Sequence, residues 1–237
     1  GKGITGARLT GNNNTAVGAG AGLSLQGAAA QNVLIGTQAG DAITTGQENI
    51  LIGMRAGAHN INLATGNNNI LIGSYIDTPA ANTSNAIGLG YDIAANGGFT
   101  TLGSGNDDIR AAHGNVTWAT VSDQRYKKDI ADSTAGLAFV NALQPRTFKY
   151  KNLGELPTAF RAYEADSTAV FKNSNINHGF IAQEVKAAID ADSSIKDGFR
   201  LWDSRDDGSQ EVAEAALIPI LVKAIQELTA RITTLEG

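Results

Sequence analysis

The chain has 237 residues, a formal net charge of −5 and no cysteine. The absence of cysteine excludes disulfides, thiolate zinc sites and cysteine nucleophiles, and the absence of a basic surplus argues against a general nucleic-acid binder. The three histidines show no close metal-ligand spacing, so we expect no metal and no cofactor. The longest apolar run, over 215–222, is too short to span a membrane. A start at Gly1 without a basic, apolar leader is expected of an excised fragment or a mature product.

Composition changes sharply near residue 121. Residues 1–121 hold 22 of the 28 glycines, whereas residues 122–237 hold 31 of the 41 charged side chains and 10 of the 14 aromatic ones. The length leaves room for one large or two small domains. We therefore predict two domains, a repetitive β-rich domain over 1–121 and a second domain over 122–237.

The first domain repeats one short pattern, in which an asparagine (threonine in the last copy) precedes a short apolar run and a glycine. The copies end at Gly18, Gly36, Gly53, Gly73, Gly88 and Gly103, with spacings of 18, 17, 20, 15 and 15 residues. Such a run is typical of a strand between turns, and the near-constant spacing indicates one stacked unit. Stacked asparagines can form hydrogen-bonded ladders.

Each repeat has too few apolar residues to bury a core alone, so it packs on neighbouring repeats, on other chains, or on both. Two architectures satisfy this requirement, namely a single-chain β-solenoid and a slender trimeric β-shaft. We find no catalytic constellation in this domain, because its acidic residues are dispersed along the chain.

The second domain has the pattern of an α+β domain. The expected elements are a helix over 135–143, a strand over 146–151, a loop or hairpin over 152–177, a strand over 178–181 and a helix through 184–189. Asp132 or Ser133 is the expected cap of the first helix, and Pro145 lies just beyond its end.

The last segment predicts a long helix from about Ala213 to Leu235. Its apolar residues follow a 3, 4, 3, 4, 3 spacing, with isoleucine at a and leucine at d positions: Ile218, Leu221, Ile225, Leu228, Ile232 and Leu235. This seam is typical of a coiled coil between partner chains, and the alternative is an ordinary amphipathic helix docked on its own domain. Fewer than three heptads make an independent coiled coil marginal, and this pattern alone favours two strands, so trimerisation needs other contacts as well.

Ser122 and Lys127 lie at the boundary between the two domains. Serine and lysine form a nucleophilic pair when a neutral lysine removes the hydroxyl proton, and burial or nearby positive charge favours a neutral lysine. Arg125 and Lys128 are candidates for that charge. Five residues apart, the two side chains lie on different sides of a helix or strand, so a pair requires a bend or two chains. The alternative is a helix cap followed by solvated charges.

The segment 122–130 resembles the start of the self-cleaving intramolecular chaperone domain at the C-termini of phage tail spikes, tail fibres and endosialidases. The likeness continues through 143–150, 178–185 and 217–228, in that order, and covers essentially all of 122–237. The upstream repeats also resemble those of phage fibre shafts.

This resemblance implies a domain that trimerises, promotes folding of the preceding β-rich fibre and then releases itself by autoproteolysis. The implied scissile bond is Val121–Ser122, with Ser122 as nucleophile and Lys127 as general base. The block that contains His178 and Glu184 is a family signature; we expect a structural role for both residues first, and a supporting role at the site second.

The implied protein is the C-terminal part of a viral tail fibre, assembled as a homotrimer in the host cytoplasm and carried in the virion. A host receptor or glycan is the expected partner of the fibre part, with neither nucleic-acid binding nor membrane insertion. The main alternative is a non-enzymatic trimeric β-repeat adhesin with an uncleaved coiled-coil domain. An ice- or glycan-binding solenoid is less well supported, because the inner repeat positions are Val, Leu and Ile and form no threonine array.

Overall fold

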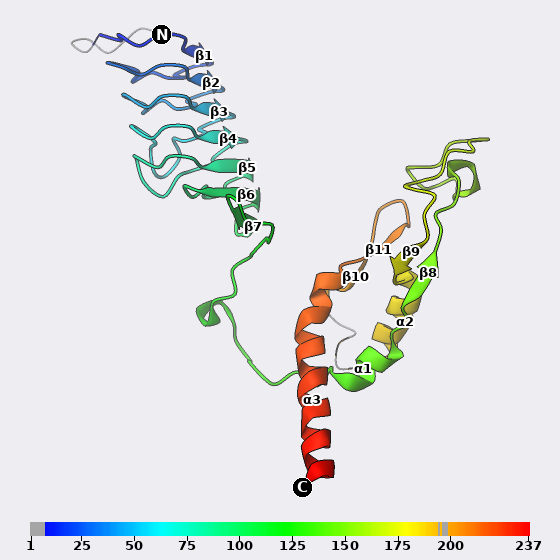
Figure 1. Ribbon diagram of the computed structural model, residues 1–237. Coiled ribbons are helices and arrows are strands. Elements are labelled where there is room, and N and C mark those ends of the chain that lie inside the picture. The colour runs from blue at the N-terminus through cyan, green and yellow to red at the C-terminus, as the bar shows by residue number, and fades with distance from the viewer. Residues whose placement is uncertain (1–7, 194, 196–198) are drawn as a thin grey trace. The chain divides into compact units, whose positions relative to one another are not determined.

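The computed structural model describes residues 8–193, 195 and 199–237 (Figure 1). It contains two compact units, one up to Lys128 and the other from Asp129 onward. The unit boundary thus lies a few residues beyond the predicted domain boundary at 121/122, which stays a prediction. Each unit is described by itself.

The first unit is a β-solenoid, in which the strands stack one above the next (Figure 1). Within its described residues, seven strands form one sheet in chain order: β1 (Thr15–Val17), β2 (Val33–Ile35), β3 (Ile50–Ile52), β4 (Ile70–Ile72), β5 (Ile87–Tyr91), β6 (Phe99–Ser104) and β7 (Asp107–Ala112). Strands β1 to β6 are parallel, and β7 pairs with β6 in the antiparallel direction. Every predicted repeat therefore forms a strand.

The solenoid has a continuous apolar interior. The middle residues of successive strands, Leu34, Leu51 and Leu71, are fully buried and lie side by side in register. Residues from the turns, such as Ile43 and Leu63, complete the same core. The predicted packing of repeats on their neighbours is confirmed, because one repeat alone has too few apolar side chains to exclude water.

Buried asparagines form the predicted ladder at the start of the strands. The side-chain amide of Asn32 donates to Asn14 Oδ1 (2.9 Å), that of Asn49 to Asn32 Oδ1 (3.0 Å), and that of Asn69 to Asn49 Oδ1 (2.9 Å). Each asparagine thereby fixes the register of the next turn, because a buried amide without a partner is costly.

Close contact between turns requires the glycine at the end of the first four repeats; in the fifth repeat Gly90, and not the predicted Gly88, takes this position, because Gly88 pairs with the buried Leu71. Gly36 has a φ of 127°, and a Cβ atom there would lie 2.6 Å from the carbonyl oxygen of Gly53. A side chain at this corner would therefore separate the turns.

The second unit is an α+β domain, as predicted. Its helices are α1 (Leu137–Ala142), α2 (Ala182–Ala191) and α3 (Ile218–Glu236), with 3-10 turns η2 (Leu153–Glu155) and η3 (Glu214–Leu217). Its strands are β8 (Arg146–Phe148), β9 (Asn177–Gly179), β10 (Trp202–Ser204) and β11 (Gln210–Val212), and they form the antiparallel pairs β8–β9 and β10–β11. None of the helices in the described part of the chain is both long and apolar enough to cross a bilayer.

Several local predictions for this unit need correction. Helix α1 is capped at Gly136 and not at Asp132 or Ser133, because a carboxylate from α3 binds its first amide. Strand β8 ends at Phe148, and the segment 152–177 contains η2 and an antiparallel bridge between Asn152 and Val170. The β10–β11 hairpin was not predicted.

Helix α3 packs on its own unit through a face other than the predicted seam. Ile220 and Ala224 of α3 are buried, and so is Leu217 at the end of η3; Leu217 and Ile220 lie in a core with Phe139 and Val185. All six seam residues are exposed, with exposed fractions between 42% and 87%. Helix α3 therefore docks on its own domain, as the alternative had it, but through other residues than the seam, and a coiled coil through the seam stays a prediction.

Candidate functional site

Ala119 and Thr120, just before the predicted cleavage point, are hydrogen-bonded to the last strand of the solenoid. The backbone groups of Ala119 and Arg110 exchange two hydrogen bonds, of 2.8 and 2.9 Å, and Thr120 Oγ1 donates to the carbonyl of Asp108. These contacts fix the segment on strand β7. The Val121–Ser122 peptide bond follows immediately after them, and both of its residues are exposed.

A short 3-10 turn, η1 (Gln124–Tyr126), follows the Val121–Ser122 bond. Asp123 is its N-cap residue, and its Oδ1 accepts a 2.8 Å hydrogen bond from the backbone amide of Arg125. The chain leaves the turn at Lys127 in an extended conformation. Short polar residues such as aspartate stabilise helix starts in this way.

This turn brings Ser122 and Lys127 together. Lys127 Nζ donates a 2.7 Å hydrogen bond to Ser122 Oγ. The bend that the sequence required between the two residues is therefore η1, and one chain suffices to form the contact. A lysine nitrogen within hydrogen-bonding distance of a serine hydroxyl is the arrangement that a serine–lysine nucleophile needs.

Arg125 is not free to act on Lys127 as we expected. Its guanidinium binds the carboxylate of Asp123 through two hydrogen bonds, Nε to Oδ1 (3.0 Å) and Nη2 to Oδ2 (2.7 Å). These hydrogen bonds from Arg125, first from its side chain and then from its backbone, lower the pKa of Asp123. The charge of Arg125 is thus compensated locally.

Asp123 is the residue of this site that sequence reasoning missed. Its two carboxylate oxygens hold both the backbone and the side chain of Arg125, and so they shape the turn between Ser122 and Lys127. The available signal was an aspartate directly before a short helical turn, which is a common N-cap pattern.

His178 and Glu184 both lie in the second unit. Glu184, in the first turn of α2, accepts two hydrogen bonds from the guanidinium of Arg146, at 2.9 and 3.0 Å, and this contact lowers the pKa of Glu184. His178 lies on β9 opposite Thr147 of β8 and is exposed. The contact of Glu184 joins α2 to β8, and the roles expected for His178 and Glu184 stay predictions.

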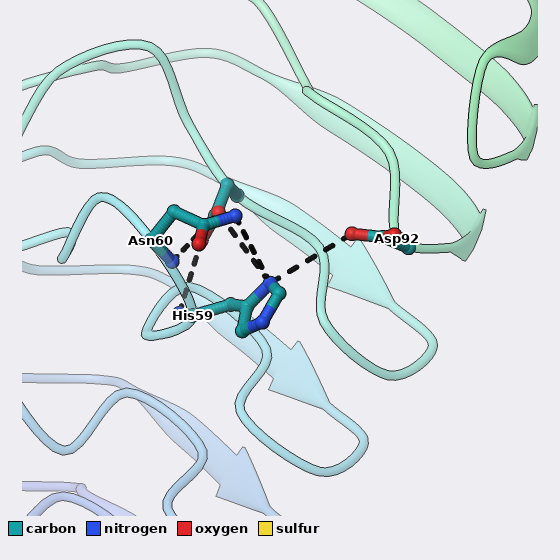
Figure 2. Close-up of polar contacts among 4 residues, drawn as sticks. His59, Asn60 and Asp92 are labelled. Carbon is teal, nitrogen blue, oxygen red and sulfur yellow. Dashed lines mark hydrogen bonds and ion pairs between the residues drawn. The ribbon is translucent and has the colours of Figure 1, made fainter.

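A second polar cluster lies on the solenoid, around His59 (Figure 2). His59 Nδ1 lies 3.7 Å from Asp92 Oδ1 and 3.9 Å from Asp77 Oδ2, and the two oxygens of Asp77 accept the backbone amides of His59 and Asn60. The His59 ring also packs on Tyr75, with centroids 4.7 Å apart. These contacts anchor the loop of the longest repeat, and the described residues contain no group of three or more side chains suited to a metal ion.

Comparison with known proteins finds one family similar to the segment that begins at Ser122. Residues 122–193, just under a third of the chain, match the family model described as chaperone of endosialidase, and the family carries a peptidase name. No curated protein matches the chain, and no solved structure does.

Proposed function

We propose that the chain is the C-terminal part of a phage tail fibre that assembles as a trimer and then cuts itself at Val121–Ser122. The match of residues 122–193 to the chaperone-of-endosialidase family supports this proposal. The 2.7 Å contact between Lys127 Nζ and Ser122 Oγ carries this proposal. It places a base beside the hydroxyl of the residue that follows the scissile bond.

The chemistry is an acyl transfer followed by hydrolysis. Neutral Lys127 takes the hydroxyl proton as Ser122 Oγ bonds to the carbonyl carbon of Val121. The bond from that carbon to the Ser122 nitrogen then breaks, and the nitrogen receives the proton as an amine. Water hydrolyses the resulting ester, which leaves a carboxylate on Val121 and restores the Ser122 hydroxyl.

Assembly supplies what one chain lacks. Every residue from Val121 to Lys128 is exposed in a single chain, whereas a lysine is neutral mainly where water is excluded. Neighbouring copies that exclude water from Ser122 and Lys127 therefore activate the two residues, and cleavage follows assembly. This order lets the chaperone unit act on the fibre before it is released.

The division of labour follows from folding physics. A fibre built from long-range or intermolecular contacts nucleates slowly, and a C-terminal unit that gathers the chains raises their effective concentration. The exposed seam of α3, from Ile218 to Leu235, is the proposed contact between the copies. Loss of the template after assembly makes unfolding a one-way process, so the fibre gains lifetime.

The proposed setting follows from this role. Assembly takes place in the host cytoplasm, the fibre part is carried in the virion, and the chaperone unit is released. The exposed surface of the solenoid is the proposed contact for a host receptor or glycan.

Mass spectrometry of freshly purified protein tests the cut. The expected result is a pair of fragments with a new N-terminus at Ser122, and Ser122→Ala and Lys127→Ala should each abolish it. Ser133→Ala and Lys149→Ala, at exposed positions outside the site, are matched controls that should still be cut. An intact chain after prolonged incubation of the folded trimer would instead favour the uncleaved trimeric adhesin.

A further inference from the structure

The outward face of the solenoid sheet is apolar over four consecutive turns. On strands β2 to β5, the buried middle residue is flanked by two residues that point outward. All eight of these flanking residues are Val, Ile or Leu: Val33, Ile35, Ile50, Ile52, Ile70, Ile72, Ile87 and Leu89. We call this surface the outer sheet face.

Its residues lie in two straight columns along the stack. The first column runs from Val33 to Ile87 and the second from Ile35 to Leu89, because the parallel register pairs like positions. In the second column Ile35, Ile72 and Leu89 are 37%, 40% and 38% exposed. The columns are about 7 Å apart, the distance between residues i and i+2 of a strand.

A parallel sheet with one bare apolar face is unusual. Parallel sheets are nearly always covered on both sides, and their strands are then apolar on both faces. Here the inner side faces the solenoid core around Leu51, and the outer side carries β-branched residues where a water-exposed sheet would alternate with polar ones. The sequence of each strand therefore fits a sheet that is covered on its outer face.

We infer that the outer sheet face is an interface between copies of this chain, which line up in parallel so that each face is shared by two neighbours around a threefold axis. This inference rests on the trimer of the proposed function. A heterologous contact of this kind closes into a ring when the rotation between copies is 120°.

Another copy is the occupant that the surface favours. The exposed apolar area of the outer sheet face is on the order of 500 Å², at the upper end of what monomers expose. It is also smaller than the roughly 800 Å² per partner of a stable interface. Copies would therefore associate weakly through this face alone, and contacts between their second units would hold them together. A copy also brings identical columns at the same spacing, so that ridges of one face fit between those of the next.

Paired cysteines in the full chain test the arrangement, because the natural sequence has no cysteine. One variant carries Ile50→Cys with Ile52→Cys, and a second carries Val33→Cys with Ile35→Cys, both with Ser122→Ala so that the units stay joined. The control carries Leu23→Cys with Ile61→Cys, two exposed apolar positions outside the strands. Light scattering gives the mass of each variant, and a non-reducing gel after mild oxidation gives the links.

The expected result is a trimeric mass with covalent dimers and trimers for both face variants. Links should form at least about tenfold faster than in the control, because neighbouring copies hold the thiols at high effective concentration. A trimeric mass without disulfide links in either face variant would overturn the inference but not the trimer itself. Covalent dimers without covalent trimers would indicate a twofold contact in place of the ring. A monomeric mass would refute the proposed assembly, and this inference with it. Self-cleavage, measured on the chain with Ser122 intact, is independent of all these outcomes.

Discussion

The carboxylate of Glu227 accepts a 2.9 Å hydrogen bond from the backbone amide of Leu137, 90 residues earlier in the chain. Leu137 is the first residue of α1, so a side chain of α3 caps α1. The preceding residue is Gly136, where a Cβ atom would lie 2.6 Å from Glu227 Oε1. One face of α3 thus holds the second unit together, while the neighbouring face carries the exposed seam.

Loss of this cap should weaken the second unit. We expect Glu227→Ala to reduce its free energy of unfolding by about 1 kcal/mol, the usual effect of removing an N-cap acceptor. Hydrogen exchange of the amides in α1 measures the local effect, and Glu236→Ala, at the exposed end of the same helix, is the control. Equal protection of α1 in both variants would show that the cap contributes nothing.

Substitution of an asparagine in the buried ladder should cost more unfolding free energy than loss of the α1 cap. Asn49 is fully buried, its amide donates to Asn32 Oδ1 and the carbonyl of Gly66, and its Oδ1 accepts from the backbone and side chain of Asn69. Asn49→Ala leaves several buried groups without partners, each at a cost of about 1–3 kcal/mol. We therefore expect the solenoid to lose at least about 2 kcal/mol of unfolding free energy in urea titrations.

The exposed Asn62 is the matched position for this comparison. Asn62→Ala removes the same side chain from a loop and should change stability by less than about 0.5 kcal/mol. If the two variants unfold at the same urea concentration, the ladder is not a source of stability.

The strands and the asparagine ladder of the solenoid were predictable because they depend on local patterns that repeat along the sequence. The strand at Ile50–Ile52 and its neighbours follow from an Asn–apolar–Gly pattern that recurs at near-constant spacing. The ladder at Asn49 follows from the same repetition, because equal positions on stacked turns must meet. Ser122 and Lys127 were found through their motif, although the turn that joins them was not.

The features that were missed depend on contacts between distant residues. The cap of α1 comes from Glu227, which no local pattern around Leu137 indicates. Helix α3 carries two apolar stripes, and only the fold reveals that Ile220 faces the core while Ile225 faces outward. The hairpin over 202–212 has few apolar residues, so its alternation is too weak to be recognised.

Acid should loosen the β10–β11 hairpin through Asp207. Hydrogen bonds from the backbone amide of Arg161 and from the hydroxyl and amide of Ser209 lower the pKa of Asp207 from 3.8 to about 2. A carboxyl with a lowered pKa stabilises the fold above its unfolded value, and this stabilisation is lost as pH falls through the folded one. Asp207 therefore stabilises the second unit above about pH 4 and ceases to do so near pH 2.

The measurement is the difference in melting temperature between the natural chain and Asp207→Asn from pH 6 down to pH 2. The difference should be largest above pH 4 and should shrink towards zero near pH 2. Asp206→Asn, a neighbouring exposed position, should show no such trend. A difference that stays constant over the whole range would mean that ionisation of Asp207 does not stabilise the hairpin.

The cap that Asp123 provides for η1 should set the rate of self-cleavage, although Asp123 does not touch the reacting atoms. Asp123→Ala removes the cap of η1, so the contact between Lys127 Nζ and Ser122 Oγ should form less often. Misplacement of this kind lowers the rate about 10- to 100-fold. Asp123→Ser keeps an oxygen that can cap the turn and should recover most of the rate, although it cannot hold the guanidinium. Time courses of fragment formation give the cleavage rates of the natural chain, Asp123→Ala and Asp123→Ser, with Asp132→Ala as the control. Equal rates for Asp123→Ala and the natural chain would mean that Ser122 and Lys127 meet without this turn, and failure of Asp123→Ser to recover would point instead to the ion pair with Arg125.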